Sequence, residues 1–407
     1  MGDKALRKGL SITAIVLVII SAILMSLTNA ESIVYGTGMI FYGAPFIAAA
    51  AIPLLVVLIV LSRYCYKTDT LQDMIATIGV RYAIFGWFYI FMMKSTVAAL
   101  YLFCYDFFSE NYSSIYLILN SLNVCAGGTL VLSIVLRKVP RYIIPKRKMK
   151  FGYLLLLIMM MYGVTLVGTV MGLPIHLVLS SIRLQSTTEN GSLGGLMMNS
   201  GQIIMTVTIG ILPAIFEELL FRKFLIDRTI RHGEFISCAM SGIMFGLWHG
   251  NFQQFFFAFF VGVMFAFVYI RTGKIIYTMI MHASMNLVTT TVTLQLLFGI
   301  MRRMGYDAST GTMAEMSDME MFINVMPLIL LLLIWLLFLL SFQIAGLVVV
   351  IVKRKWFKLA KMIGEPDRKV ILHTLTHSVE MWIFFSFAIF LFLYYYLPDI
   401  LSVFIAR

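Results

Sequence analysis

The sequence predicts an all-α fold: a polytopic transmembrane helical bundle of about eleven spans, within a range of eight to eleven. Hydrophobic residues make up 61% of the 407-residue chain and charged residues only 12%, whereas soluble domains are about 45–50% apolar and about 25% charged. Apolar stretches recur along the chain, and each has about the 20 residues that a helix needs to cross a bilayer. Basic residues gather in alternate connections between these stretches, as they do in multi-pass membrane proteins.

The first apolar stretch resembles a signal peptide, because Lys4, Arg7 and Lys8 precede it. Its apolar run from Leu10 to Leu27 is long enough to span, and no small-residue cleavage site follows, so we expect a retained first helix. The later stretches are bounded by polar connections, and the seventh and eighth are the shortest. The predicted spans are 9–28, 39–62, 82–105, 114–136, 151–180, 199–221, 235–249, 253–270, 275–299, 324–352 and 379–401.

The net charge of +12 comes from 31 Lys and Arg against 19 Asp and Glu. Most of the basic residues lie at the N-terminus or in connections that fall on one side of the membrane if eleven spans are right. Because Lys and Arg mark cytoplasmic loops, we expect a multi-pass protein of the cell membrane with a cytoplasmic N-terminus. This placement assigns the positive charge to membrane lipid headgroups and argues against nucleic acid as a partner. The basic connections are 63–81, 137–150, 222–234, 271–274 and 353–369.

The longest basic connection, 137–150, contains Pro140 and Pro145 and separates four leading spans from the rest. We interpret residues 1–150 as accessory N-terminal transmembrane helices and 151–300 as the functional helical core. Residues 301–407 then supply C-terminal transmembrane helices with a basic cytoplasmic loop. No internal repeat of the kind found in many transporters is apparent in the sequence, so a proton-coupled transporter gains little support.

Ionisable groups inside membrane spans are costly and are candidates for function. Glu217 and Glu218 stand side by side in ILPAIFEELLFRKFL, after a long apolar run. Glu218 and Arg222 are four residues apart and can pair along one helix face. The alternative is that the helix has reached the surface here and the pair is a solvated helix end.

Three more polar residues fall at comparable depth on neighbouring spans. Glu217 lies sixteen residues before Gly233, a helix-ending glycine, and His249 lies sixteen residues after it. At about 1.5 Å per residue both are roughly 24 Å from that turn. His282 and Asn286, nine and thirteen residues after Gly273, share a helix face. The alternative is that these are unrelated polar residues in interhelical hydrogen bonds.

A carboxylate beside a histidine in a dry site can take a proton from water. A second histidine and an amide can donate hydrogen bonds to the oxyanion that forms when water adds to a peptide carbonyl. The set is therefore typical of a hydrolase. Alternatively, Glu217, His249 and His282 could bind a divalent metal such as zinc that acidifies the water. No HExxH run, G-x-S-x-G motif or CxxC pair occurs in the sequence.

Three ordered motifs resemble one known family. They are Glu-Glu-x-x-x-Arg (Glu217 to Arg222), Phe-x-x-x-His (Phe245 to His249) and His-x-x-x-Asn (His282 to Asn286), within about residues 200–295. Together they look like the CPBP family, which comprises type II CAAX prenyl endopeptidases and bacteriocin-processing intramembrane proteases, also called Abi proteins. The context GLWHGNFQQF, with Asn251 where eukaryotic members usually have a second histidine, resembles the bacterial branch.

The resemblance implies that Glu217 and His249 activate the attacking water and that His282 and Asn286 form the oxyanion hole. It implies supporting roles for Glu218 and Arg222. Phe245 would form a wall of the cavity, although plain core packing accounts for it equally well. Family members have been described both as metalloproteases and as metal-independent glutamate proteases, and we favour the second description, with no cofactor.

The leading hypothesis is an intramembrane endopeptidase that hydrolyses a peptide bond of a membrane-associated peptide or protein. Its substrate would be a C-terminal tail or a bacteriocin-like peptide. The alternative is a non-catalytic membrane scaffold, or a bacteriocin-immunity or peptide-binding protein, of the same fold.

Overall fold

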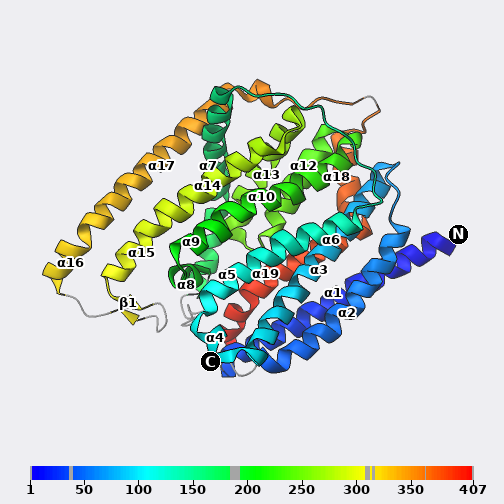
Figure 1. The fold of residues 1–407 in the computed structure, drawn as a ribbon. Helices are drawn as coiled ribbons and strands as arrows, with labels where there is room; N and C mark the ends of the chain where they lie inside the picture. Colours follow the sequence, from blue (N-terminus) through cyan, green and yellow to red (C-terminus); the bar gives the residue numbers. More distant parts are fainter. Residues whose placement is uncertain are drawn as a thin grey trace.

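The computed structural model describes residues 2–35, 40–183, 193–307, 312–313, 317–362 and 364–405. These residues are almost entirely helical, which confirms the all-α prediction (Figure 1). In this part of the chain the strands are limited to β1 (Tyr306–Asp307) and β2 (Thr312–Met313), which pair in antiparallel orientation. The sequence therefore folds as the helical bundle that its composition predicts.

The N-terminal half of the chain contains α1 (Gly2–Tyr35), α2 (Ile40–Tyr64), α3 (Leu71–Phe103), α4 (Tyr105–Glu110), α5 (Tyr112–Leu122), η2 (Asn123–Gly127), α6 (Gly128–Val135) and α7 (Phe151–Arg183). The middle contains α8 (Leu193–Met198), α9 (Gln202–Met205), η4 (Thr206–Ile211), α10 (Leu212–Glu218), η5 (Leu219–Phe224), α11 (Leu225–Thr229), η6 (Ile230–His232), α12 (Glu234–Trp248) and α13 (Phe252–Thr272). The remainder contains α14 (Ile275–Val288), η7 (Thr289–Thr293), α15 (Leu294–Arg303), α16 (Asp318–Asn324), α17 (Met326–Val352), η8 (Arg354–Phe357), α18 (Arg368–His377) and α19 (Val379–Ile405).

Helices occupy the eleven segments predicted to span the membrane; residue 39 lies outside the described residues. Of the described helices, seven are long and apolar enough to cross a membrane, or eight if α18 and α19, bent by 69°, form one span. The three other predicted segments fall in α1, α2 and α12, and α12 has only 15 residues. The chain is thus a multi-pass membrane protein with seven to eight spans identified by length and composition.

The first and last helices of the chain pack together in one bundle. α19, the last helix, packs against α1 and α3, while α17 packs against α7 on the other side of the molecule (Figure 1). Between these groups, α10 contacts α14, and α13 packs on both α12 and α7. Residues 301–407 therefore contribute helices to two separate parts of the bundle.

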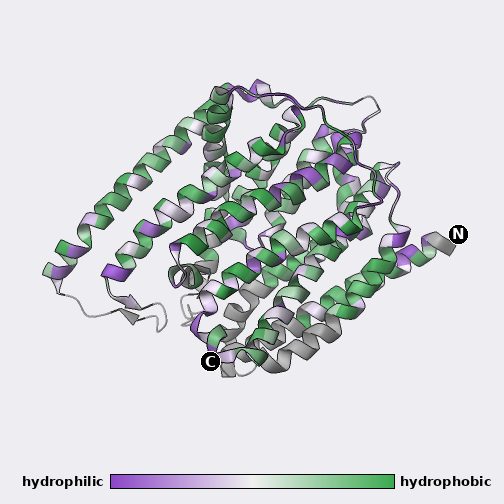
Figure 2. Ribbon diagram, viewed as in Figure 1, coloured by the Kyte–Doolittle hydropathy of each residue, from purple (hydrophilic) through white to green (hydrophobic). Residues whose placement is uncertain are grey.

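Hydrophobic residues cover the long helices, and hydrophilic residues gather in the connections at one end of the bundle (Figure 2). One of these connections is tied to the bundle at Glu234, the first residue of α12. Its carboxylate binds both Nη atoms of Arg271, at 2.6 and 2.8 Å, and accepts the backbone N–H of Ala360 at 2.6 Å. The segment between α17 and α18 is thereby fixed across the ends of α12 and α13.

Two predicted helix ends are confirmed. Gly233 separates η6 from α12 with a φ of 120°, and Gly273 ends α13 in the left-handed conformation with a φ of 60°. Both backbone conformations favour glycine because a Cβ atom would be strained there. Close packing of glycines also brings α12 and α13 together, since a Cβ atom on Gly262 would lie 3.0 Å from the Cα atom of Gly242.

Candidate active site

The two adjacent glutamates lie on one continuous helical run, Gln202–His232, which contains two π-helical segments. The first segment, η4, ends just before α10, and the second, η5, begins immediately after Glu218. In a π-helical turn the hydrogen bonds run over five residues, and such turns occur frequently at functional sites. The α10 segment that carries both carboxylates is therefore only seven residues long.

Both carboxylates are buried in the bundle instead of forming a solvated helix end. Glu218 is fully buried and Glu217 is 9% exposed. His282 on α14 contacts both, because its Nδ1 atom lies 3.0 Å from Glu218 Oε1 and its Nε2 atom lies 3.9 Å from Glu217 Oε2. The first distance is a hydrogen bond, and the second is too long for a direct hydrogen bond. One imidazole thus links the two carboxylates through its opposite ring nitrogens.

Arg222 supplies the positive charge nearest to Glu218. Its Nε atom lies 3.1 Å from Glu218 Oε2, as the four-residue spacing predicts, although the angles of this ion pair fall outside the range of a hydrogen bond. The guanidinium lies over the rings of Phe245 and Phe265, 4.5 and 5.2 Å from their centroids. In the described part of the protein its Nη atoms have no hydrogen-bond partner. Charge and cation–π contacts therefore hold this fully buried side chain.

His249 lies at the C-terminal end of α12 and is partly buried. Its Nδ1 atom bonds the backbone oxygen of Phe245 at 2.8 Å. Because a carbonyl oxygen only accepts, Nδ1 carries the hydrogen, and Nε2 is the acceptor in the neutral ring. The Phe245 ring meets the imidazoles of both His249 and His282 edge-on, with centroid distances of 5.0 and 5.8 Å. Phe245 therefore packs between the two histidines.

Asn286 contacts the helix that carries the two glutamates at η4, the segment that precedes α10. Its Nδ2 atom donates to the backbone oxygen of Ile209 in η4 at 3.0 Å. That oxygen lacks its usual helical donor four residues on, because Pro213 has no N–H. One amide N–H of Asn286 thus completes the backbone of η4.

The structure brings Glu217, Glu218, Arg222, Phe245 and His282 into one connected cluster. His249 joins the cluster through Phe245, and Asn286 joins it through the backbone of η4. The sequence paired Glu217 with His249 by depth, whereas the imidazole contact that the structure gives to Glu217 is with His282. The seven predicted site residues therefore lie on three parts of the chain: the helical run Gln202–His232, α12 with its C-terminal cap, and α14.

Three positioning side chains are not apparent from the sequence. Ser121 donates to the backbone oxygen of Thr208 in η4 at 2.7 Å, and Ser241 donates to that of Phe221 in η5 at 2.9 Å. Tyr82, which is fully buried, donates to the backbone oxygen of Leu220 in η5. The Phe221 oxygen is free for this because the N–H of residue 225 bonds to residue 222 instead. Proline at 213 is a sequence signal for the first interruption, but nothing comparable marks the second.

The residues that would bind a metal do not converge on one ion. In the described ranges, no group of three or more His, Cys, Asp and Glu side chains is arranged to hold a metal. The two nitrogens of His282 are directed to different carboxylates, and the second carboxylate oxygen of Glu218 faces Arg222. Zinc sites need at least three protein ligands at about 2.0–2.3 Å from one centre. Among the described residues, the arrangement at Glu217, Glu218 and His282 does not fit a zinc site.

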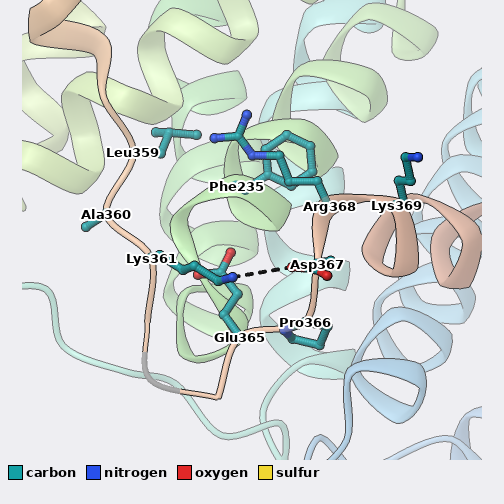
Figure 3. Close-up of a pocket in the computed structure, with 9 residues that line it drawn as sticks. All are labelled: Phe235, Leu359, Ala360, Lys361, Glu365, Pro366, Asp367, Arg368 and Lys369. Atoms are coloured by element: carbon teal, nitrogen blue, oxygen red, sulfur yellow. Dashed lines mark hydrogen bonds and ion pairs between the residues drawn. The ribbon is translucent and has the colours of Figure 1, made fainter.

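A separate pocket lies at the start of α12, away from this cluster (Figure 3). It is lined by Phe235, by the end of the segment between α17 and α18, and by the first residues of α18. Lys361 and Asp367 pair across its rim at 3.4 Å. None of the seven predicted site residues lines this pocket.

Comparison with known families finds one match, which covers part of the chain. A family model described as type II CAAX prenyl endopeptidase Rce1-like matches residues 199–288, a range that contains all seven predicted site residues. No similar protein was found among curated proteins, and none among solved structures. The family match supports the CPBP family and a peptidase activity for this chain.

Proposed function

We propose that the protein is an intramembrane endopeptidase that hydrolyses a peptide bond of a membrane-associated peptide or protein. One observation carries the proposal: two adjacent, buried carboxylates contact opposite nitrogens of a single buried imidazole. Buried charges are expensive, and such a cluster inside a membrane protein is expected to serve function. The match to a CAAX endopeptidase family model over the same residues supports this chemistry.

Glu217 is the proposed general base. A water held between Glu217 Oε2 and His282 Nε2, which are 3.9 Å apart, would lie within hydrogen-bond reach of both groups. Glu217 takes a proton from this water as the water oxygen bonds to the scissile carbonyl carbon. When the tetrahedral intermediate collapses, the carbon–nitrogen bond breaks and the proton passes to the leaving amine.

Glu218 and Arg222 are proposed as positioning residues. Glu218 accepts the hydrogen from Nδ1 of His282, which fixes the ring so that Nε2 points toward Glu217. The Glu218–Arg222 pair is neutral, so an imidazolium at His282 would balance the negative charge of Glu217. In that form Nε2 can donate to the developing oxyanion.

His249 and Asn286 complete the proposed site. With Nδ1 bonded to the Phe245 oxygen, His249 Nε2 keeps a lone pair. In this proposal it accepts a hydrogen from the attacking water. The second N–H of Asn286 can donate to the oxyanion while the first holds the Ile209 oxygen. The reaction then needs no metal, and the substrate supplies only the peptide bond.

The proposed substrate and topology rest on the family resemblance and on the distribution of basic residues. We propose a C-terminal tail or a bacteriocin-like peptide at the lipid boundary, cleaved by a bacterial protein of the cell membrane whose N-terminus is cytoplasmic. In this proposal residues 151–300 form the catalytic core, and the helices of residues 1–150 and 301–407 support it and hold it in the lipid. Reporter fusions at the N-terminus and in the connection 137–150 would report the topology.

The decisive experiment uses Glu217→Gln, which preserves shape but cannot act as a base. Purified wild-type and variant proteins in liposomes are given quenched fluorescent peptides, either farnesylated with a CAAX end or unlipidated, and products are identified by mass spectrometry. We expect cleavage to fall by at least about a hundredfold, in line with the loss of a general base. Glu110→Gln, at an exposed carboxylate on α4, is the matched control and should cleave as wild type does.

Three outcomes would overturn parts of the proposal. If the Glu217→Gln variant cleaves at nearly the wild-type rate, Glu217 is not the base. If wild type binds these peptides but cleaves none of them, the scaffold or immunity function replaces the enzyme. Activity that disappears after exhaustive chelation and returns with zinc would show that a metal is required.

A further inference from the structure

A cationic pocket of about 490 Å³ lies where α6 ends and α11 passes beside it. We call it the α6–α11 pocket. Four basic side chains line it, and its lining contains no acidic residue. The four are Arg137, Lys138, Arg141 and Arg228. The proposed catalytic chemistry does not use these residues.

Arg228 forms a fixed wall of the α6–α11 pocket, unlike the three exposed cations of the loop. It is 8% exposed, and its Nη atoms donate to the backbone oxygens of Phe224 and Leu136 at 3.0 and 3.1 Å. Its Nε atom is buried, and among the described residues it has no hydrogen-bond partner. Because hydrogen bonds to the backbone hold both Nη atoms, Arg228 supplies a positive charge at a fixed place beside the pocket.

The neighbouring acidic residue does not neutralise the pocket. Asp227 accepts the hydroxyl of Tyr269 at 2.6 Å and pairs with Lys223 Nζ at 2.7 Å. Its carboxylate is therefore already paired, and it is not among the residues that line the pocket. The four cations keep an unbalanced positive charge that an anion would offset.

The α6–α11 pocket opens at the end of a membrane span. The candidate span Tyr112–Val135 ends two residues before Arg137. Leu130 and Ile134, in the last two turns of α6, are 61% and 62% exposed. An apolar face that leads to a cluster of cations matches a lipid whose acyl chains lie on a helix and whose headgroup reaches the interface.

We propose that the α6–α11 pocket binds the headgroup phosphate of an anionic phospholipid, with the acyl chains along the exposed face of α6. The lipid is favoured over free phosphate because only a lipid can occupy both the cationic pocket and the adjoining apolar face. Arg228 lies eleven residues after Glu217 on the same helical run, so the bound lipid would also hold the helix that carries the carboxylates.

The test titrates the purified full-length protein in detergent with short-chain phosphatidylglycerol, phosphatidylcholine or inorganic phosphate, and follows bound lipid by native mass spectrometry. Each basic residue near a lipid surface contributes roughly a fivefold change in binding. Arg137→Gln with Arg141→Gln should therefore weaken phosphatidylglycerol binding about 25-fold. The matched control is Lys146→Gln with Lys148→Gln, which removes the same charge from the same loop outside the pocket and should bind as wild type does.

Three results would overturn the proposal. Equal losses in the two double variants would mean that the loop attracts lipid without a pocket. Equal binding of phosphatidylcholine and phosphatidylglycerol would exclude recognition of the anionic headgroup. Inorganic phosphate that binds as tightly as phosphatidylglycerol would identify a soluble anion as the ligand. Because the readout is lipid binding, the result does not depend on peptide cleavage.

Discussion

The buried ion pair between Glu218 and Arg222 gives a quantitative test of the site. We consider Glu218→Gln, Arg222→Met and the double variant as a double-mutant cycle. Both side chains are fully buried and lie 3.1 Å apart. Removing one partner of a buried pair leaves an uncompensated charge and costs about 3–5 kcal/mol, whereas replacing both can be nearly neutral.

The structure indicates that Arg222→Met lowers the free energy of unfolding by an amount near the lower end of that range. When the guanidinium is lost, Glu218 still accepts a hydrogen bond from His282 Nδ1 at 3.0 Å, which compensates part of its charge. The methionine side chain also keeps the contacts with the two phenylalanine rings that cover the guanidinium. We expect about 3 kcal/mol for Arg222→Met and a coupling energy of about 2–3 kcal/mol between the two substitutions.

The assay is reversible unfolding in mixed micelles with increasing SDS, followed by tryptophan fluorescence, for wild type and all three variants. Lys361→Met and Asp367→Asn form the control cycle, because this pair is 69% and 83% exposed and should couple by less than about 1 kcal/mol. The losses of unfolding free energy in Glu218→Gln and Arg222→Met can be summed and compared with the loss in the double variant. Agreement within about 0.5 kcal/mol would refute the reasoning, because independent sites add to that extent.

Three further predictions concern other parts of the chain. Tyr82→Phe leaves a buried η5 carbonyl without its donor, and we expect a loss of about 1–3 kcal/mol in the same unfolding assay, with cleavage reduced beyond the loss of folded protein. Burial raises the pKa of the Cys65 thiol to about 12, so this thiol stays protonated and unreactive at pH 8. Maleimide should therefore label the exposed Cys104 much faster than Cys65. Equal labelling rates, measured by mass spectrometry, would contradict the burial of Cys65. Gly346→Ala would place a Cβ atom against a backbone oxygen of α7 and should lower the melting temperature by several degrees, whereas Gly152→Ala, with open space around it, should not.

The sequence was most informative where local chemistry decides the structure. Gly233 and Gly273 end their helices where they were expected, because a positive φ favours glycine. Glu218 and Arg222 pair as their four-residue spacing predicts. The three motifs share one site because the helices that carry them pack together. The sequence had indicated a shared site, because charged and polar residues are rare inside so apolar a chain.

The sequence was least informative about which imidazole each carboxylate meets. The depth comparison placed Glu217 opposite His249 by assuming an ideal helix on both sides of Gly233. In the structure, η5 and η6 lie between Glu217 and that turn, and neither has α-helical geometry. One extra residue in a π-helical turn rotates the following face by roughly 100°. Spacing can therefore estimate depth, but it cannot assign the facing partner, and Glu217 lies beside His282.

The π-helical segments also explain why helices outside the proposed catalytic core matter to it. In lipid a backbone carbonyl without a donor costs several kcal/mol, so each interruption of the glutamate-bearing helix needs a side-chain donor from a neighbour. Ser121 on α5 and Tyr82 on α3 supply two of these donors, and both come from residues 1–150. Ser241 on α12 and Asn286 on α14 supply the others. The short α10 segment that holds both carboxylates is thus fixed at each end by hydrogen bonds from four other helices, and two of those helices belong to the part of the chain that the sequence marked only as accessory.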